Sequence, residues 1–134
     1  MQAQGQGRGL VSRMAEIRVK NLDKADEIRK FVAHGYAEVV TAGELTLVRG
    51  TFEPGWRWSV DVKPIMGTDL CPVHHTGMLL AGRMHIEYSD GSAVDLRAGD
   101  VFDFPPGHDA WVSGDEPCTT VDVSSEAGRY AAGR

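Results

Sequence analysis

The chain has 134 residues, 25% charged residues and a formal net charge of −5, which are ordinary values for one soluble globular domain. No apolar run approaches the ~18 residues of a membrane-spanning helix, and an acidic chain is not attracted to an anionic membrane surface. Because the basic residues are scattered, the sequence also predicts no nucleic-acid-binding surface.

The first segment in chain order, residues 1–13, lacks the apolar stretch of a signal peptide. Its Gln, Gly and Arg content predicts a disordered leader, followed by a single domain over residues 14–134. The next segment, residues 21–31, carries the one helical pattern of the chain and predicts a short N-terminal helix that Asn21 or Asp23 caps. Its apolar positions are sparse: Leu22, Ile28 and Phe31.

The rest of the chain is typical of short β-strands separated by turn residues. In residues 56–63, tryptophan and valine alternate with polar residues, and this period of two predicts a strand with both tryptophans on the face opposite Asp61 and Lys63. Further strands are predicted at residues 44–52, 78–81, 83–88, 92–97, 101–104, 111–113 and 118–123. Short strands at intervals of about ten residues, with Gly and Pro between them, predict an all-β antiparallel sandwich or barrel.

The stretches PGWRWSVDVKP and HHTGMLLAGRMHI, with GDVFDFPPGHDAW further on, resemble the paired motifs of the cupin superfamily. The resemblance covers roughly residues 50–112. It implies a double-stranded β-helix, or jelly-roll barrel, that binds a small molecule in its interior and frequently forms a homodimer.

The same resemblance locates the positions of the usual cupin metal ligands, which are three histidines and one glutamate. In this chain these positions hold Asp61, Lys63, His75 and Ala110. Lys63 is a cation that opposes a divalent ion, and Ala110 has no ligand atom. The usual four-ligand site is therefore expected to be absent.

A substitute metal site remains open as an alternative to a metal-free barrel with a polar lining. His75 takes an inward position, and His108 lies two residues before Ala110, hence on the same face of a regular strand. Asp61 and Cys71 complete a set of nitrogen, oxygen and sulfur donors that suits a zinc, iron or manganese ion.

His75 and His108 have two interpretations: half-buried imidazoles with backbone or carboxylate partners, or ligand-binding and acid–base groups. His74 is expected on the opposite face from His75. The two cysteines form no CxxC pair, and free thiols are typical of a cytoplasmic protein. Cys118 is expected in the core, whereas a catalytic thiol at Cys71 would need a nearby base, for which His74 or His75 could serve.

The charged residues of the first motif also have two interpretations. Asp61 and Lys63 either pair with each other or belong to the pocket, where Lys63 and Arg57 present positive charge to an anionic ligand such as a carboxylate. The large aromatic side chains Trp56 and Trp58 are expected in the core, or next in a dimer interface.

These features favour a small-molecule-binding barrel with a sensor, carrier or accessory role. The alternative is an enzyme. One version is a metal-free isomerase or cyclase that uses His75 or His108 as its base, and the other is a metal-dependent oxygenase or lyase that uses the substitute ligand set. A purely structural dimerisation module is the third interpretation.

Overall fold

The computed structural model describes residues 16–123 and 127–132, and the leader predicted over residues 1–13 lies outside them. The elements of the described residues are, in chain order, η1 (Leu22–Lys24), β1 (Glu27–Lys30), β2 (Gly35–Ala42), β3 (Leu45–Phe52), α1 (Trp58–Asp61), α2 (Lys63–Met66), β4 (His75–Ala81), β5 (Arg83–Tyr88), β6 (Ala93–Arg97), β7 (Val101–Phe104), β8 (His108–Val112), β9 (Cys118–Asp122) and η2 (Ala127–Arg129). None of the described helices is long and apolar enough to cross a membrane.

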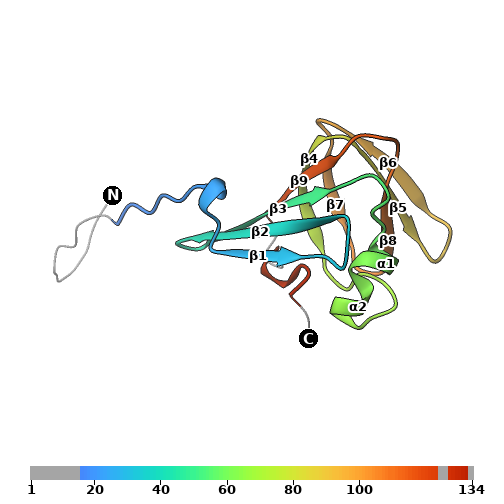
Figure 1. Cartoon of the computed structure of the whole chain (residues 1–134), viewed down its shortest axis with the longest axis horizontal. Coiled ribbons are helices and arrows are strands. Elements are labelled where there is room, and N and C mark those ends of the chain that lie inside the picture. Colours follow the sequence, from blue (N-terminus) through green and yellow to red (C-terminus); the bar gives the residue numbers. More distant parts are fainter. Residues whose placement is uncertain (1–15, 124–126, 133–134) are drawn as a thin grey trace.

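The strands form two antiparallel sheets, of order β1-β2-β3-β9-β4-β7 and β6-β5-β8. The sheets face each other as the walls of a barrel, and the β2–β3 hairpin extends beyond it (Figure 1). The all-β prediction is confirmed, and so are the predicted strands that become β3, β5–β7 and β9. The strands predicted at residues 78–81 and 111–113 cover only parts of β4 and β8. Strand β2 was missed by the sequence analysis.

The helix predicted over residues 21–31 is wrong. Only η1 is helical, a single 3₁₀ turn in which the Asn21 side chain accepts a hydrogen bond from the Asp23 backbone N–H. Strand β1 follows and pairs with β2 over its whole length. Ile28 is 58% exposed, so the sparse apolar positions offer no face that a helix could bury, whereas the edge of β2 offers backbone hydrogen bonds.

The strand predicted over residues 56–63 is also wrong, because this segment forms α1 and α2. The buried residues Trp58, Asp61, Val62 and Met66 follow helical spacing, which the alternation of the two tryptophans concealed. Both short helices lie together at one end of the barrel, and α1 contacts β8 (Figure 1). Gly67, with a φ of 75°, ends α2 in a left-handed conformation that favours glycine.

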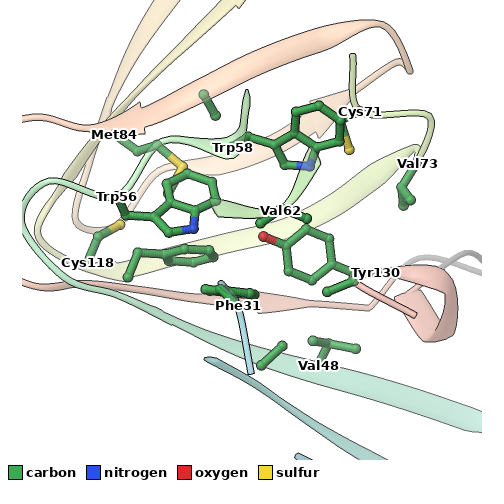
Figure 2. Close-up of a cluster of buried hydrophobic side chains, with 14 of the residues drawn as sticks. Phe31, Val48, Trp56, Trp58, Val62, Cys71, Val73, Met84, Cys118 and Tyr130 are labelled. Carbon is green, nitrogen blue, oxygen red and sulfur yellow. The ribbon is translucent and has the colours of Figure 1, made fainter. Parts of the chain in front are cut away.

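An aromatic cluster forms part of the core at the end of β3 and in the residues that follow it. Phe52 lies 4.5 Å from Trp56 and 5.5 Å from Phe31 between ring centroids, and Tyr130 packs edge-on against Phe31 at 6.0 Å. Trp58 is buried beside this group, as Figure 2 shows. The core prediction for both tryptophans and for Cys118 is confirmed, and residues of the same chain supply the cover.

Candidate functional site

Three side chains from separate parts of the sequence meet inside the barrel: Cys71, His75 and His108. One ligand atom of each lies within 4.8 Å of the other two. His75 begins β4 and His108 begins β8. The loop that carries Cys71 is fixed by backbone hydrogen bonds from Cys71 N–H to the His108 carbonyl (2.9 Å) and from Gly107 N–H to the Cys71 carbonyl (2.7 Å). These bonds hold the fully buried thiol beside both imidazoles.

The ring of His75 is oriented by a carboxylate on a neighbouring strand. Its Nδ1–H donates to Asp122 of β9, and its Nε2 lies 3.4 Å from the Cys71 sulfur. Strands β4 and β9 approach closely here because β4 has a glycine opposite Asp122: a Cβ on Gly77 would lie 1.9 Å from the Val121 carbonyl oxygen. The glycine therefore permits the contact that orients His75.

The ring of His108 is oriented by a backbone carbonyl. Its Nδ1 lies 3.0 Å from the Pro105 carbonyl oxygen. Because a carbonyl only accepts, Nδ1 carries a proton, and Nε2 is the nitrogen left to face another partner. Both histidines of the cluster thus have Nδ1 engaged by an acceptor, which leaves Nε2 of each for a ligand. This is the arrangement that histidine ligands of metal ions show in proteins.

The metal-free cluster favours a charged pair. Burial raises the pKa of the Cys71 thiol, but hydrogen bonds from His108 and His75 outweigh this effect and lower the pKa to about 6. Burial lowers the pKa of His75, but its hydrogen bonds to Asp122 and Cys71 raise it to about 9. At neutral pH these values make Cys71 a thiolate and His75 an imidazolium. Cys118 has no such partner, and burial raises its pKa to about 12.

The cluster borders a mainly apolar pocket in the barrel. Its walls include Phe52, Ile86, Phe102 and Phe104, with His75, His108 and Asp122 among the polar lining. The volume of the pocket is about 50 Å³. Ala110 lies in the same lining, at the position where the cupin resemblance expects a histidine.

The structure does not bring Asp61 into the cluster with the other predicted metal ligands. Asp61 is buried on α1, where its carboxylate accepts from the Arg57 backbone N–H and lies 3.1 Å from His34 Nδ1. Nor do Asp61 and Lys63 pair with each other, as one interpretation had it: Lys63 lies 3.5 Å from exposed Asp69. Both corrections follow from the helical conformation of residues that were expected in a strand.

Two other residues of the sequence analysis lie outside the pocket lining. The Arg57 guanidinium lies 3.9 Å from the centre of the Trp111 ring and 3.4 Å from the Asp109 carboxylate. His74 pairs with Asp103; the His74 side chain is partly exposed and that of Asp103 is largely exposed. The prediction that His74 and His75 face opposite ways is confirmed.

Sequence reasoning missed one functional residue, Asp122. Its signal is a carboxylate within the predicted strand that Cys118 begins, where alternation directs Asp122 and Thr120 to the same face. Both residues line the pocket. The ring of Tyr130 also packs against His75, with 5.1 Å between centroids.

The sequence matches no family profile and no curated protein. Solved structures with a similar fold include an uncharacterized conserved protein with a double-stranded β-helix domain from Klebsiella pneumoniae subsp. pneumoniae MGH 78578, at 22% identity and a TM-score of 0.55 over 84% of this chain and 92% of that one. A protein of unknown function from Rhizobium leguminosarum bv. viciae 3841 has 19% identity and a TM-score of 0.57 over 81% and 96% of the two chains.

Oxalate decarboxylase from Bacillus subtilis is also similar, at 21% identity and a TM-score of 0.56 over 79% of this chain. The match spans only 28% of the decarboxylase chain. At these identities the likeness establishes a common fold and does not extend to the reaction.

Proposed function

The chain has the double-stranded β-helix fold of the cupin superfamily, and we propose that it binds a divalent transition-metal ion through Cys71, His75 and His108. A small molecule then occupies the pocket beside the ion. The observation that carries the proposal is the convergence of one sulfur and two histidine nitrogens within 4.8 Å, with Nδ1 of both rings already engaged.

The spacing and chemistry of the donors fit such an ion. In a tetrahedral zinc site, with Zn–S about 2.3 Å and Zn–N about 2.0–2.1 Å, sulfur and nitrogen are about 3.5 Å apart. The distance from Cys71 Sγ to His75 Nε2 is 3.4 Å. A thiolate and two imidazoles suit zinc or copper better than magnesium, calcium or manganese, which prefer oxygen donors. Three protein ligands leave a coordination position open, as in catalytic zinc sites.

The residues of the chain divide the work at such a site. The ion, when bound, supplies a Lewis acid that polarises an oxygen of the small molecule. The Cys71 thiolate would offset one positive charge of the ion. Asp122 would keep the Nε2 lone pair of His75 directed at the ion, and the phenylalanine walls of the pocket would limit the access of water. This arrangement serves the predicted binding protein and the predicted metal-dependent enzyme alike.

The test uses Co²⁺ as a spectroscopic probe, together with the metal content of the purified wild-type protein. We expect one Co²⁺ per chain, with the charge-transfer absorption of a cobalt–thiolate bond. Cys71→Ser should remove this band, and His75→Gln and His108→Gln should weaken binding strongly. His74→Gln is the matched control, because His74 is adjacent in sequence but faces outward. Wild-type protein that takes up no Co²⁺, Zn²⁺ or Cu²⁺ would refute the proposal.

A second candidate is metal-free nucleophilic chemistry by Cys71. Sulfur, His75 and Asp122 follow the order of nucleophile, base and orienting carboxylate that cysteine hydrolases use, and the lowered pKa of Cys71 provides the thiolate. His108 helps to lower the pKa of Cys71 but has no place in this triad. Rapid alkylation by iodoacetamide that Asp122→Asn slows and Co²⁺ leaves unaffected would favour the nucleophile over the metal site.

A further inference from the structure

Tyr130 gives the pocket a phenol hydroxyl that the proposed metal site does not use. The residue is 6% exposed and lines the same pocket as His75 and His108. Among the described residues its hydroxyl has no hydrogen-bond partner, and it is not enclosed like the unpaired indole N–H groups of Trp56 and Trp58. In Figure 2 the hydroxyl points from the C-terminal segment into the interior of the barrel. It is therefore available to a molecule that enters the pocket.

The C-terminal segment fixes the position of the Tyr130 ring. Arg29 of β1 donates hydrogen bonds from Nη1 to the backbone carbonyls of Gly128 (2.7 Å) and Tyr130 (2.9 Å). The Arg29 guanidinium is itself held by two hydrogen bonds to the Glu27 carboxylate. The ring packs edge-on against His75, with 5.1 Å between centroids. The hydroxyl is thus positioned at the pocket before a ligand binds, so that binding need not order it.

Packing alone does not account for a tyrosine at this position. Phe52, Phe102 and Phe104 also form walls of the pocket, and they supply apolar surface without a hydroxyl. A buried hydroxyl without a partner is unfavourable, because it loses its hydrogen bonds to water on folding. Phenylalanine would fill nearly the same volume without this loss. Since a tyrosine O–H donates a hydrogen bond, the residue indicates a ligand with an acceptor atom.

From these features we infer that the hydroxyl of Tyr130 donates a hydrogen bond to the ligand of the proposed metal ion. The ligand class that fits is a compact molecule with one oxygen function, which faces the cluster and Tyr130, and an apolar body against the phenylalanine walls. The inference rests on the proposed function, because it takes the ion as the site where the oxygen binds. Arg57 and Lys63, which the sequence analysis expected beside the ligand, do not line the pocket.

Azide binding to Co²⁺-loaded protein tests the inference. Azide is a suitable probe because it is compact, binds Co²⁺ and accepts hydrogen bonds at its nitrogen atoms, and its affinity can be measured from the visible spectrum of the ion. We expect Tyr130→Phe to weaken azide binding about 10- to 100-fold, the effect of one hydrogen bond lost to a charged acceptor. The affinity for Co²⁺ itself should be unchanged, because the ring and its contact with His75 are retained.

Tyr88→Phe is the matched control. Tyr88 packs edge-on against the other histidine, His108, with 5.6 Å between centroids. Its hydroxyl, however, donates to the Pro105 carbonyl at 2.8 Å, and the residue lies outside the pocket lining. Azide affinity should therefore equal that of the wild type. The infrared stretch of bound azide is a second readout: it should shift in Tyr130→Phe and not in Tyr88→Phe, because a hydrogen bond to azide alters its vibration.

The outcomes separate this inference from the metal proposal. Thermal melts establish that both variants are folded, and Tyr130→Phe should melt no lower than the wild type, because no hydrogen bond within the described structure is lost. Equal azide affinity and an unchanged stretch in Tyr130→Phe would overturn the inference and leave the metal site standing. A parallel loss of Co²⁺ and azide affinity would also overturn it, since Tyr130 would then support His75 and not the ligand. Wild-type protein that takes up no Co²⁺ would refute the metal proposal and this inference with it.

Discussion

Asp122 is the residue through which the metal proposal can be tested without touching a ligand atom. Its side chain is buried and accepts from His75 Nδ1–H, so it sets which nitrogen of His75 faces Cys71. Asp122→Asn retains the shape and one acceptor oxygen but loses the negative charge. Loss of such a carboxylate partner weakens metal binding by about 10- to 100-fold, or about 1.4–2.7 kcal/mol. We therefore expect Co²⁺ affinity to fall by this factor, with the cobalt–thiolate band retained because Cys71 is intact.

The assay is a competition titration of Co²⁺ against a chromophoric chelator, at fixed pH, on Asp122→Asn and on Asp103→Asn. Asp103 forms the same kind of pair with His74, but on the outer face and largely exposed. Its replacement should change the affinity by less than about twofold, because exposed pairs contribute little. Circular dichroism of both variants establishes that they are folded. Equal affinities of Asp122→Asn and the wild type would refute the argument that the carboxylate orients His75 toward an ion.

Four further outcomes follow from the proposed site and its surroundings. In metal-free protein, the ultraviolet absorbance of the Cys71 thiolate should rise with a midpoint near pH 6, while Cys118 stays protonated to about pH 12. Cys71→Ser should remove this rise in absorbance. The free energy of unfolding should be nearly constant between about pH 6.5 and 9, because two effects oppose each other: as pH rises, the lowered pKa of Cys71 adds stability and the raised pKa of His75 removes it. In Cys71→Ser only the His75 effect remains, so thermal melts should show stability falling as pH rises. Gly77→Ala should lower the free energy of unfolding by about 1–3 kcal/mol in urea titrations. Gly128→Ala is the control and should be tolerated, because a Cβ there meets only Thr46, at 3.7 Å. Equal losses in the two variants would contradict the close approach of β4 and β9. Calorimetry should show the melting temperature rising by about 10 °C at a Co²⁺ concentration 100 times the Kd, and no rise with Mg²⁺.

The barrel could be predicted from the sequence because its strands obey a local rule. Alternation in residues 83–88 and 101–104 reflects one buried and one exposed face, and turn residues separate the strands. The rule fails at residues 56–63, where Trp56 and Trp58 alternate by coincidence while burial follows a helical period. A short segment at the end of a barrel has few residues with which to distinguish the two periods.

The candidate site could be predicted only in part, for a related reason. The inward positions of His75 and His108 follow from strand parity and from the cupin resemblance. The orientation of Cys71 depends on backbone hydrogen bonds of a loop, and the role of Asp122 depends on the pairing of β9 with β4 across 47 positions of sequence from His75. Neither contact produces a periodic pattern in the sequence, so both became visible only in the three-dimensional structure.

The position of the cluster explains how a barrel without the usual cupin ligands can still offer a metal site. Ala110 replaces the expected histidine, but His108 lies two residues earlier on the same face of β8, about 7 Å toward the start of the strand. At that end of β8 the loop with Cys71 pairs with His108, which brings the Cys71 sulfur to the two histidines as the third donor of the proposed metal site. The space left beside Ala110 becomes the apolar pocket, where the unsatisfied indoles of Trp56 and Trp58 lie. The position of His108, two residues before Ala110, thus places the Cys71–His75–His108 cluster beside the pocket.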